Sequence, residues 1–169
     1  MLIVWWIWLE EKEKKMSKTL VIYISFSGVT KKVAERVSEL LNSDILEIKP
    51  AIPYTNEDLN WNDLMSRSSK EMQDSDSRPE IEELGDISSY DIIYIGYPIW
   101  WGTYPREINT FMDKYDLAGK TIIPFCTSGG TGISKSIRDF KKFLPNSDVK
   151  EGKRLSVYDV ESWIKSINI

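Results

Sequence analysis

The sequence contains no histidine and a single cysteine, Cys126. Without histidine the chain cannot form a Ser-His-Asp or Cys-His catalytic arrangement, and most zinc sites are excluded as well. One cysteine cannot form an internal disulfide, which fits a reducing, cytoplasmic setting. We therefore expect a cytoplasmic protein with no metal site and no catalytic residue of these kinds.

An excess of positive charge is also absent. Lys and Arg number 22 against 26 Asp and Glu, so the net charge is −4 and the pI is near 5.0. No basic stripe interleaved with aromatic residues is present, and nucleic-acid binding is therefore not expected. The length of 169 residues, with 41% hydrophobic and 28% charged residues, fits one globular domain with a sizeable core.

The N-terminal apolar run is too short to cross a membrane. Residues 2–9 are apolar and include three tryptophans, whereas a spanning helix needs about 20 residues. Charged residues 10–15 follow this run, without the charge order or small residues of a secretory signal. Because Met16 leads at once into the first predicted strand, residues 16–169 are predicted to form the domain and 1–15 a non-essential extension. The alternative is an interfacial membrane anchor, and stable membrane insertion is not expected.

Strand and helix patterns alternate along the rest of the chain. Short apolar runs rich in β-branched residues predict strands, and apolar residues at i, i+3, i+4 and i+7 predict helices. The predicted strands are 19–25, 44–49, 92–96, 121–125 and a weakly marked one between 149 and 157; the predicted helices are 30–41, one within 57–75, 105–115, one after 132, and 159–167. Strands separated by helices indicate an α/β fold, in which a parallel sheet is covered on both faces.

The first strand runs directly into a loop that carries hydroxyl groups and a glycine. This loop contains Ser25, Ser27, Gly28 and Thr30 and opens the first predicted helix. Backbone N–H groups and the positive end of a helix dipole meet at such a point, which suits a phosphate. The loop has no carboxylate to repel an anion. The alternative is that Ser and Thr only cap the helix.

Two further loops follow the predicted strands 92–96 and 121–125. The loop 96–105 contains the adjacent pair Trp100 and Trp101, and the loop 127–132 is rich in glycine. Since ligands of parallel sheets bind beyond the carboxyl ends of the strands, the three loops together predict a pocket for a flat, phosphorylated ring. The alternative is that the tryptophans pack into the core or against a neighbouring subunit.

The three loops carry a family resemblance. Ser25-Phe26-Ser27-Gly28-Val29-Thr30 resembles the phosphate signature of flavodoxins, and the other two loops are similar to the flavin-ring loops of that family. The resemblance covers the chain from Met16 to Ile169. It implies a flavodoxin-like three-layer sandwich with a five-stranded parallel sheet, strand order 2-1-3-4-5, and one non-covalent FMN.

The resemblance also assigns residues to the parts of FMN. It implies phosphate contacts from Ser25, Ser27, Gly28, Val29 and Thr30, ring contacts from Pro98, Ile99, Trp100, Trp101 and Gly102, and contacts to the pyrimidine edge from Thr127, Ser128, Gly129, Gly130 and Gly132. The chain departs from short flavodoxins at Thr103 and Tyr104, where acidic residues are common, and no aromatic residue follows the third loop.

Other nucleotide and phosphate proteins of the α/β class fit poorly. A phosphorelay receiver needs acidic residues where Ser25 and Tyr97 stand, and a low-molecular-weight phosphatase needs an arginine where Gly132 stands. No P-loop Gly-Lys-Ser/Thr and no convincing dinucleotide-binding glycine pattern is present.

Two functions follow from a bound flavin. The first is a low-potential electron carrier that docks between redox partner proteins, a reductase and an acceptor, through its acidic surface. The second is an FMN-dependent NAD(P)H:quinone-type oxidoreductase, in which the long connection 50–88 forms part of a substrate pocket. Tyr54, Trp61 and Arg67 lie in that connection, and packing or a solvated surface is the preferred explanation for each of them. A structural role without flavin is a third reading. We expect the carrier, because no residue set indicates a nicotinamide site.

Overall fold

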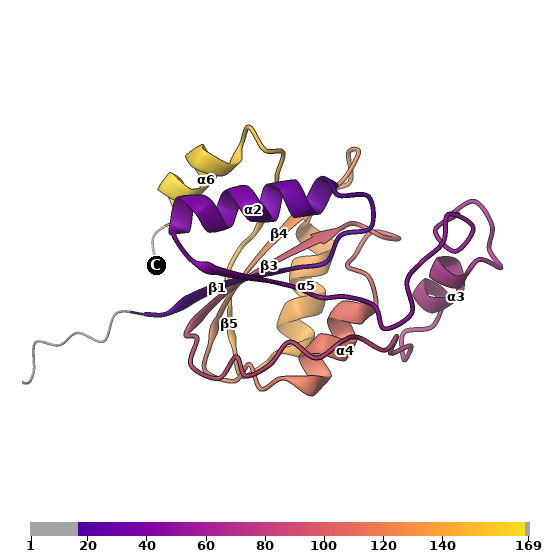
Figure 1. Cartoon of the computed structure of the whole chain (residues 1–169), viewed down its shortest axis with the longest axis horizontal. Helices are drawn as coiled ribbons and strands as arrows, with labels where there is room; N and C mark the ends of the chain where they lie inside the picture. The colour runs from indigo at the N-terminus through magenta and orange to yellow at the C-terminus, as the bar shows by residue number, and fades with distance from the viewer. Residues whose placement is uncertain (1–16, 168–169) are drawn as a thin grey trace, which may run out of the picture.

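The computed structural model describes residues 17–167, which form a parallel β-sheet between two layers of helices (Figure 1). The strands are β1 (Thr19–Tyr23), β2 (Asp44–Glu47), β3 (Ile92–Pro98), β4 (Thr121–Thr127), β5 (Asp148–Val149) and β6 (Lys153–Arg154). The order is β2-β1-β3-β4-β5, and every pairing is parallel. The predicted α/β fold and strand order are therefore confirmed.

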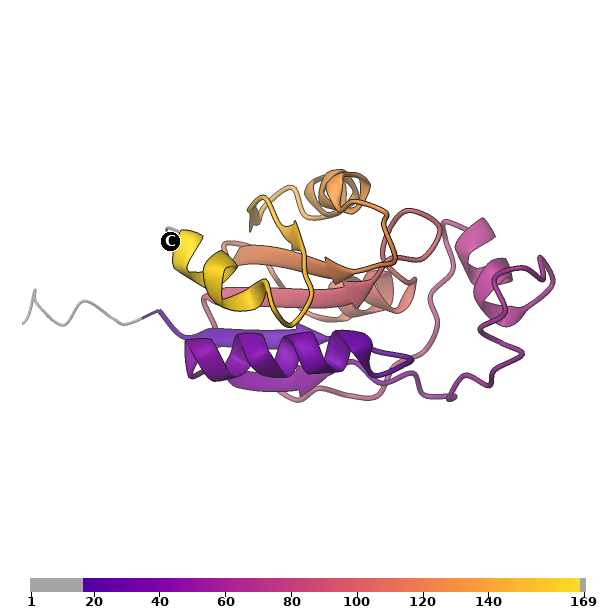
Figure 2. The same cartoon turned by 90° about the horizontal axis from the view of Figure 1, so that it is seen from above.

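Alternating side chains of the strands build a core on each face of the sheet. The helices are α2 (Val29–Leu41), α3 (Arg67–Gln73), α4 (Glu107–Lys114), α5 (Ser134–Phe143) and α6 (Val160–Ser166). Leu20 and Ile22 of β1 pack in the same cluster as α4 and α5, whereas Val21 packs in the cluster of α2 and α6. Figure 2 shows α2 and α6 together on one side of the sheet. The three-layer arrangement leaves the carboxyl ends of the strands free for a site.

The fifth position of the sheet is divided between two short strands instead of the single strand predicted within 149–157. β5 pairs with the start of β4 and β6 with its end. The interruption lies beside Pro124, which has no backbone N–H to donate to a ladder. Gly152 passes so close that a Cβ there would lie 2.0 Å from the Pro124 carbonyl oxygen. A glycine is therefore required where the chain crosses this point.

The long connection 50–88 extends beyond the carboxyl ends of the strands (Figures 1 and 2). The helix predicted within 57–75 is α3, which covers Arg67–Gln73. Ser66 is its N-cap, and the Ser66 side chain accepts a hydrogen bond from the Ser69 N–H. Before α3, side chains of Thr55, Asp58 and Asp63 accept hydrogen bonds from nearby backbone N–H groups. Such local bonds compete with a helix and shorten it. The connection is therefore rich in turns and contains one short helix, α3. We call residues 50–88 the flap.

Two expectations concern the ends of the chain and membranes. The predicted extension 1–15 lies outside the described residues, so that prediction stays a prediction. Across residues 17–167, no helix combines the length and apolar character that crossing a membrane demands.

Candidate functional site

The three predicted loops meet at one cavity beyond the carboxyl ends of β1, β3 and β4. Its volume is about 880 Å³. The predicted site residues that line it are Ser27, Thr30, Pro98, Ile99, Trp100, Trp101, Thr127 and Gly129, together with Phe26, Leu59, Trp61, Leu64, Ser68 and Thr131. A cavity of this size accommodates a ligand as large as a drug or a nucleotide cofactor.

The N-terminus of α2 opens at this cavity and has free hydrogen-bond donors. The first bond within the helix runs from the Lys32 N–H to the Gly28 carbonyl at 3.2 Å, so the N–H groups of residues 29–31 have no partner within the helix. Gly28, with φ at 86°, has no side chain to cap them, and the first turn has no acidic residue. The Ser25 hydroxyl instead accepts a hydrogen bond from the Gly28 N–H at 3.1 Å. The uncapped helix end suits an anion and argues against the capping alternative.

The first and third loops are joined by a hydrogen bond between two threonines. The hydroxyl oxygens of Thr30 and Thr127 lie 2.8 Å apart, and both residues are buried. In the third loop the Ser128 hydroxyl donates to the Thr131 carbonyl at 2.6 Å, which turns the loop on itself. As a result Thr131 lines the cavity, whereas Ser128, Gly130 and Gly132 do not.

The aromatic loop is a tight turn that presents both tryptophans to the cavity. Trp100 and Thr103 exchange backbone hydrogen bonds of 2.8 and 3.0 Å. The two central residues have positive φ angles, 50° at Trp101 and 82° at Gly102, as a type I′ turn requires. Trp101 is 47% exposed and the ring of Trp100 packs on Phe26 at a centroid distance of 4.3 Å. Neither indole is buried in the core, so the structure does not support packing of the tryptophans into the core.

The flap contributes a wall that the sequence analysis did not assign to the cofactor site. Leu59, Trp61, Leu64 and Ser68 line the cavity, although Trp61 is 70% exposed and Leu64 61% exposed. Large apolar side chains left this open commonly mark a binding surface. The signal in the sequence is a set of apolar residues among the Asn and Asp residues of a turn-rich stretch. Among residues 17–167, no charged side chain lines the cavity.

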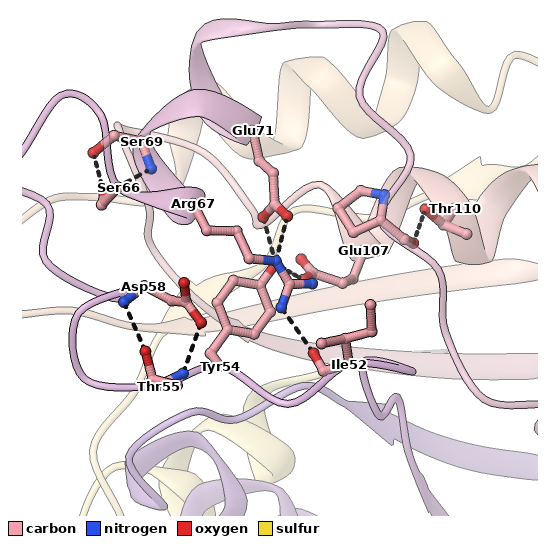
Figure 3. A network of polar contacts seen from close by, with 11 residues as sticks. Ile52, Tyr54, Thr55, Asp58, Ser66, Arg67, Ser69, Glu71, Glu107 and Thr110 are labelled. Atoms are coloured by element: carbon pink, nitrogen blue, oxygen red, sulfur yellow. Dashed lines mark hydrogen bonds and ion pairs between the residues drawn. The ribbon is translucent and has the colours of Figure 1, made fainter.

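A network of polar contacts surrounds Tyr54 (Figure 3). The Tyr54 ring packs edge-on against Phe26 and Trp100, at centroid distances of 5.1 and 5.8 Å. Its hydroxyl contacts the carboxylates of both Glu71 and Glu107. Burial raises the pKa of Tyr54, and the neighbouring carboxyl groups of Glu107 and Glu71 raise it further. Tyr54 therefore packs as a neutral phenol.

Arg67 and Glu107 complete this network. The Arg67 guanidinium stacks on the Tyr54 ring at 3.8 Å, and its Nε donates to Glu71 at 2.9 Å. Burial raises the pKa of Glu107 to about 7, although the Tyr54 hydroxyl, a backbone N–H and Arg67 act in the opposite direction. The burial of Glu107 could not be predicted from the sequence, since an acidic residue in the first turn of a helix is ordinarily solvated.

Other side chains at this end of the sheet are buried and are not reactive groups. Cys126 is fully buried, and burial raises the pKa of its thiol to about 12, so it is not a ready nucleophile. Thr103 and Tyr104, which stand where short flavodoxins have acidic residues, are both buried, and Thr103 donates to Asp139 at 2.6 Å. Within residues 17–167, no group of acidic or cysteine side chains is arranged to hold a metal ion.

The strand order and the three loops at the sheet edge define a class of α/β proteins that bind a ligand at the switch in strand order. A family model described as Flavodoxin matches residues 18–167, and the chain belongs to the flavodoxin family. This confirms the resemblance drawn from the three loops. A search of curated proteins found no match.

Several solved structures resemble the chain over most of its length. A candidate flavoprotein from Bacteroides uniformis ATCC 8492 is 46% identical, with a TM-score of 0.86 over 90% of this chain and 100% of that one. Another from Bacteroides eggerthii DSM 20697 is 43% identical, with a TM-score of 0.85 over 90% and 99%. A flavoprotein from Lactobacillus acidophilus NCFM, solved in complex with FMN, is 29% identical, with a TM-score of 0.69 over 88% and 99%.

Proposed function

We propose that the chain binds one FMN in the cavity and carries electrons with it. The observation that supports this most is the meeting of an uncapped helix N-terminus with two tryptophans in a single cavity. The free N–H groups of residues 29–31 fit a phosphate, and the aromatic side chains fit a flat ring. The similar Lactobacillus protein was solved with FMN, which supports the same cofactor here.

The residues of the chain would hold the cofactor and exclude water, while bound FMN supplies the capacity to accept and release electrons. Thr30 and Thr127 fix the distance between the phosphate loop and the glycine-rich loop through their hydrogen bond. The type I′ turn at Trp101 and Gly102 fixes the position of the two tryptophans that line the cavity. We assign the residues predicted above to these contacts, and those that do not line the cavity would act through backbone groups or by shaping the loops.

The negative charge of the protein supports the electron-carrier role. A net charge of −4 favours docking to basic patches of a reductase and an acceptor, and such long-range attraction increases association rates. No catalytic side chain is part of this proposal. The single buried cysteine fits the cytoplasm as the place of action.

The apolar wall of the flap favours a second candidate. Leu59, Trp61 and Leu64 give the cavity a surface suited to an uncharged small molecule, as in an NAD(P)H:quinone-type oxidoreductase. The part of the chain that the structure describes places no cation on the cavity wall to pair with the phosphates of a dinucleotide. For that reason the carrier remains the preferred function.

Flavin titration tests the proposal directly. The flavin-free protein should bind FMN at one site per chain and quench its fluorescence, because a tryptophan stacks near the ring. FAD and riboflavin serve as competing ligands. If FMN does not bind, the proposed function is wrong. A separate assay of steady-state NADPH turnover with a quinone distinguishes the two candidates, because rapid turnover would favour the oxidoreductase over the carrier.

Substitutions in the first loop separate phosphate binding from turn stability. Ser27→Ala and Thr30→Val should each weaken FMN binding by about 1–3 kcal/mol, because each removes a donor to a charged group. Riboflavin, which lacks the phosphate, should lose much less, and isothermal titration of both ligands measures the difference. Thr30→Ser keeps the hydroxyl and is the matched control. Equal losses for FMN and riboflavin would mean that these residues only stabilise the loop.

A further inference from the structure

Two carboxyl groups and one phenol join the flap to the body of the protein. Tyr54, Arg67 and Glu71 belong to the flap, whereas Glu107 begins α4 (Figure 3). The Tyr54 hydroxyl lies between the two carboxyl groups and contacts an oxygen of each. We call Tyr54, Glu71 and Glu107 the carboxyl latch.

The latch needs more protons than the phenol supplies. A tyrosine hydroxyl has one hydrogen and can donate it to only one acceptor. If both carboxyl groups were ionised, one of the two contacts would bring oxygen against oxygen without a hydrogen between them. One carboxyl group must therefore be protonated for both contacts to form.

The surroundings of the two carboxyl groups identify where that proton resides. Glu71 accepts a hydrogen bond from the Arg67 guanidinium at 2.9 Å, which favours its ionised form. Glu107 is 0% exposed, and among the described residues its Oε2 has no hydrogen-bond partner. The neighbouring Arg106 directs its guanidinium to the carbonyl oxygens of Glu71 and Met72 instead. Glu107 is therefore the protonated member, and its raised pKa agrees with this.

The latch is connected to the cavity through the flap. The Tyr54 ring contacts Phe26 and Trp100, both of which line the cavity. Ser68, next to Arg67 in α3, lines it as well. Loss of the Glu107 proton to water would leave two carboxylates facing one phenol, and their repulsion would separate α3 from α4. The cavity wall would then lose its support.

We propose that Glu107 is a positioning residue whose protonated form holds the flap closed, so that the cavity binds its ligand more tightly at acidic than at alkaline pH. The part about ligand affinity rests on the proposed function. The closing of the flap does not, and it is tested without ligand.

Hydrogen exchange of residues 54–73 in the unliganded protein is the principal test. At pH 4 the unaltered protein and a Glu107→Gln variant should protect this segment equally, because the glutamine amide replaces the protonated acid as a donor. As the pH rises from 4.5 to about 7, exchange in the unaltered protein should become faster by up to about 300-fold relative to the variant at the same pH and should keep this ratio up to pH 8.5, because the closed flap retains the Glu107 proton that the open flap releases. Comparison at one pH cancels the intrinsic exchange rate.

Glu83→Gln is the matched control. Glu83 also joins the connection to α4, through Lys114 at 2.9 Å, but its side chain is exposed and its pKa is lowered by that lysine. This variant should lose protection at pH 8.5 as the unaltered protein does. Parallel loss of protection in the unaltered protein and Glu107→Gln would overturn the latch.

Two further measurements keep the proposal open to refutation if Glu107→Gln folds poorly. The infrared spectrum of the unaltered protein should contain the band of a protonated carboxyl group at pH 6 that disappears by pH 8.5, and its absence at pH 6 would overturn the proposal. Riboflavin affinity should fall over the same range; riboflavin is used because the phosphate of FMN itself titrates near pH 6. If riboflavin binds equally well at both pH values, the coupling to the cavity is wrong. If no flavin binds at all, the proposed function fails while the exchange result still decides the latch.

Discussion

A Glu107→Gln variant should be more stable than the unaltered protein at pH 8 by about 3 kcal/mol, relative to the difference between them at pH 4. The pKa of Glu107 is raised from 4.5 to about 7 in the folded protein, mainly by burial. Between these two values the folded state retains a proton that the unfolded state has released, so unfolding becomes easier as the pH rises. Above pH 7 both states are ionised and the effect is constant. A shift of this size corresponds to about 3 kcal/mol.

Urea denaturation at several pH values from 4 to 8 measures this effect. The unaltered protein should lose stability across the window relative to Glu107→Gln, and the two should run parallel above it. Glu83→Gln provides the control, because the lowered pKa of Glu83 places its contribution below pH 4.5 and gives it the opposite sign. Parallel curves for the unaltered protein and Glu107→Gln between pH 4.5 and 7 would show that Glu107 is not protonated in the folded state.

A Gly152→Ala variant should lose about 2–4 kcal/mol of unfolding free energy. The added Cβ would lie 2.0 Å from the oxygen and 2.8 Å from the carbon of the Pro124 carbonyl. Backbone of a central strand cannot move aside as the end of a flexible side chain can, so β6 has to separate from β4. Chemical denaturation gives the loss, and it should appear as a lower midpoint at an unchanged slope.

Gly130→Ala is the matched control for this substitution. A Cβ at Gly130 meets nothing within 4 Å, and its φ is not in the left-handed region. Alanine there should leave stability unchanged or raise it by about 0.4–1 kcal/mol, because it restricts the unfolded chain. A Gly152→Ala variant as stable as Gly130→Ala would mean that the crossing beside Pro124 is looser than the structure indicates.

Features that depend on neighbouring residues could be predicted from the sequence, whereas features that depend on contacts between distant residues could not. The strands and the three loops were predictable, because β-branched runs and turn residues act over a few neighbouring positions. The division of the fifth strand was not, since it depends on a contact between Gly152 and Pro124 that the sequence separation hides. The helix predicted within 57–75 is present as α3, but its late start was not predictable, because the Asp and Thr side chains before α3 bind backbone groups locally.

The candidate site shows the same division. Its three loops follow strands of one parallel sheet, and the topology alone brings them together. The wall formed by Trp61 and Leu64 and the burial of Glu107 depend on how the flap folds back over α4. No periodic pattern records such a contact, so Leu64 and Glu107 could be recognised only in the structure, and Trp61 could be noted in the sequence only as part of the long connection 50–88. Contacts of the predicted residues with FMN stay predictions.

The position of β1 has a consequence for synthesis of the chain on the ribosome. β1 lies between β2 and β3 in the sheet, but β2 follows it closely in the sequence whereas β3 begins only at Ile92. At about 5–20 residues per second, β3 emerges roughly 4–15 seconds after β1. During that interval one edge of an apolar strand has no neighbour to pair with. The speed of translation through the flap therefore sets how long the nascent chain is open to aggregation.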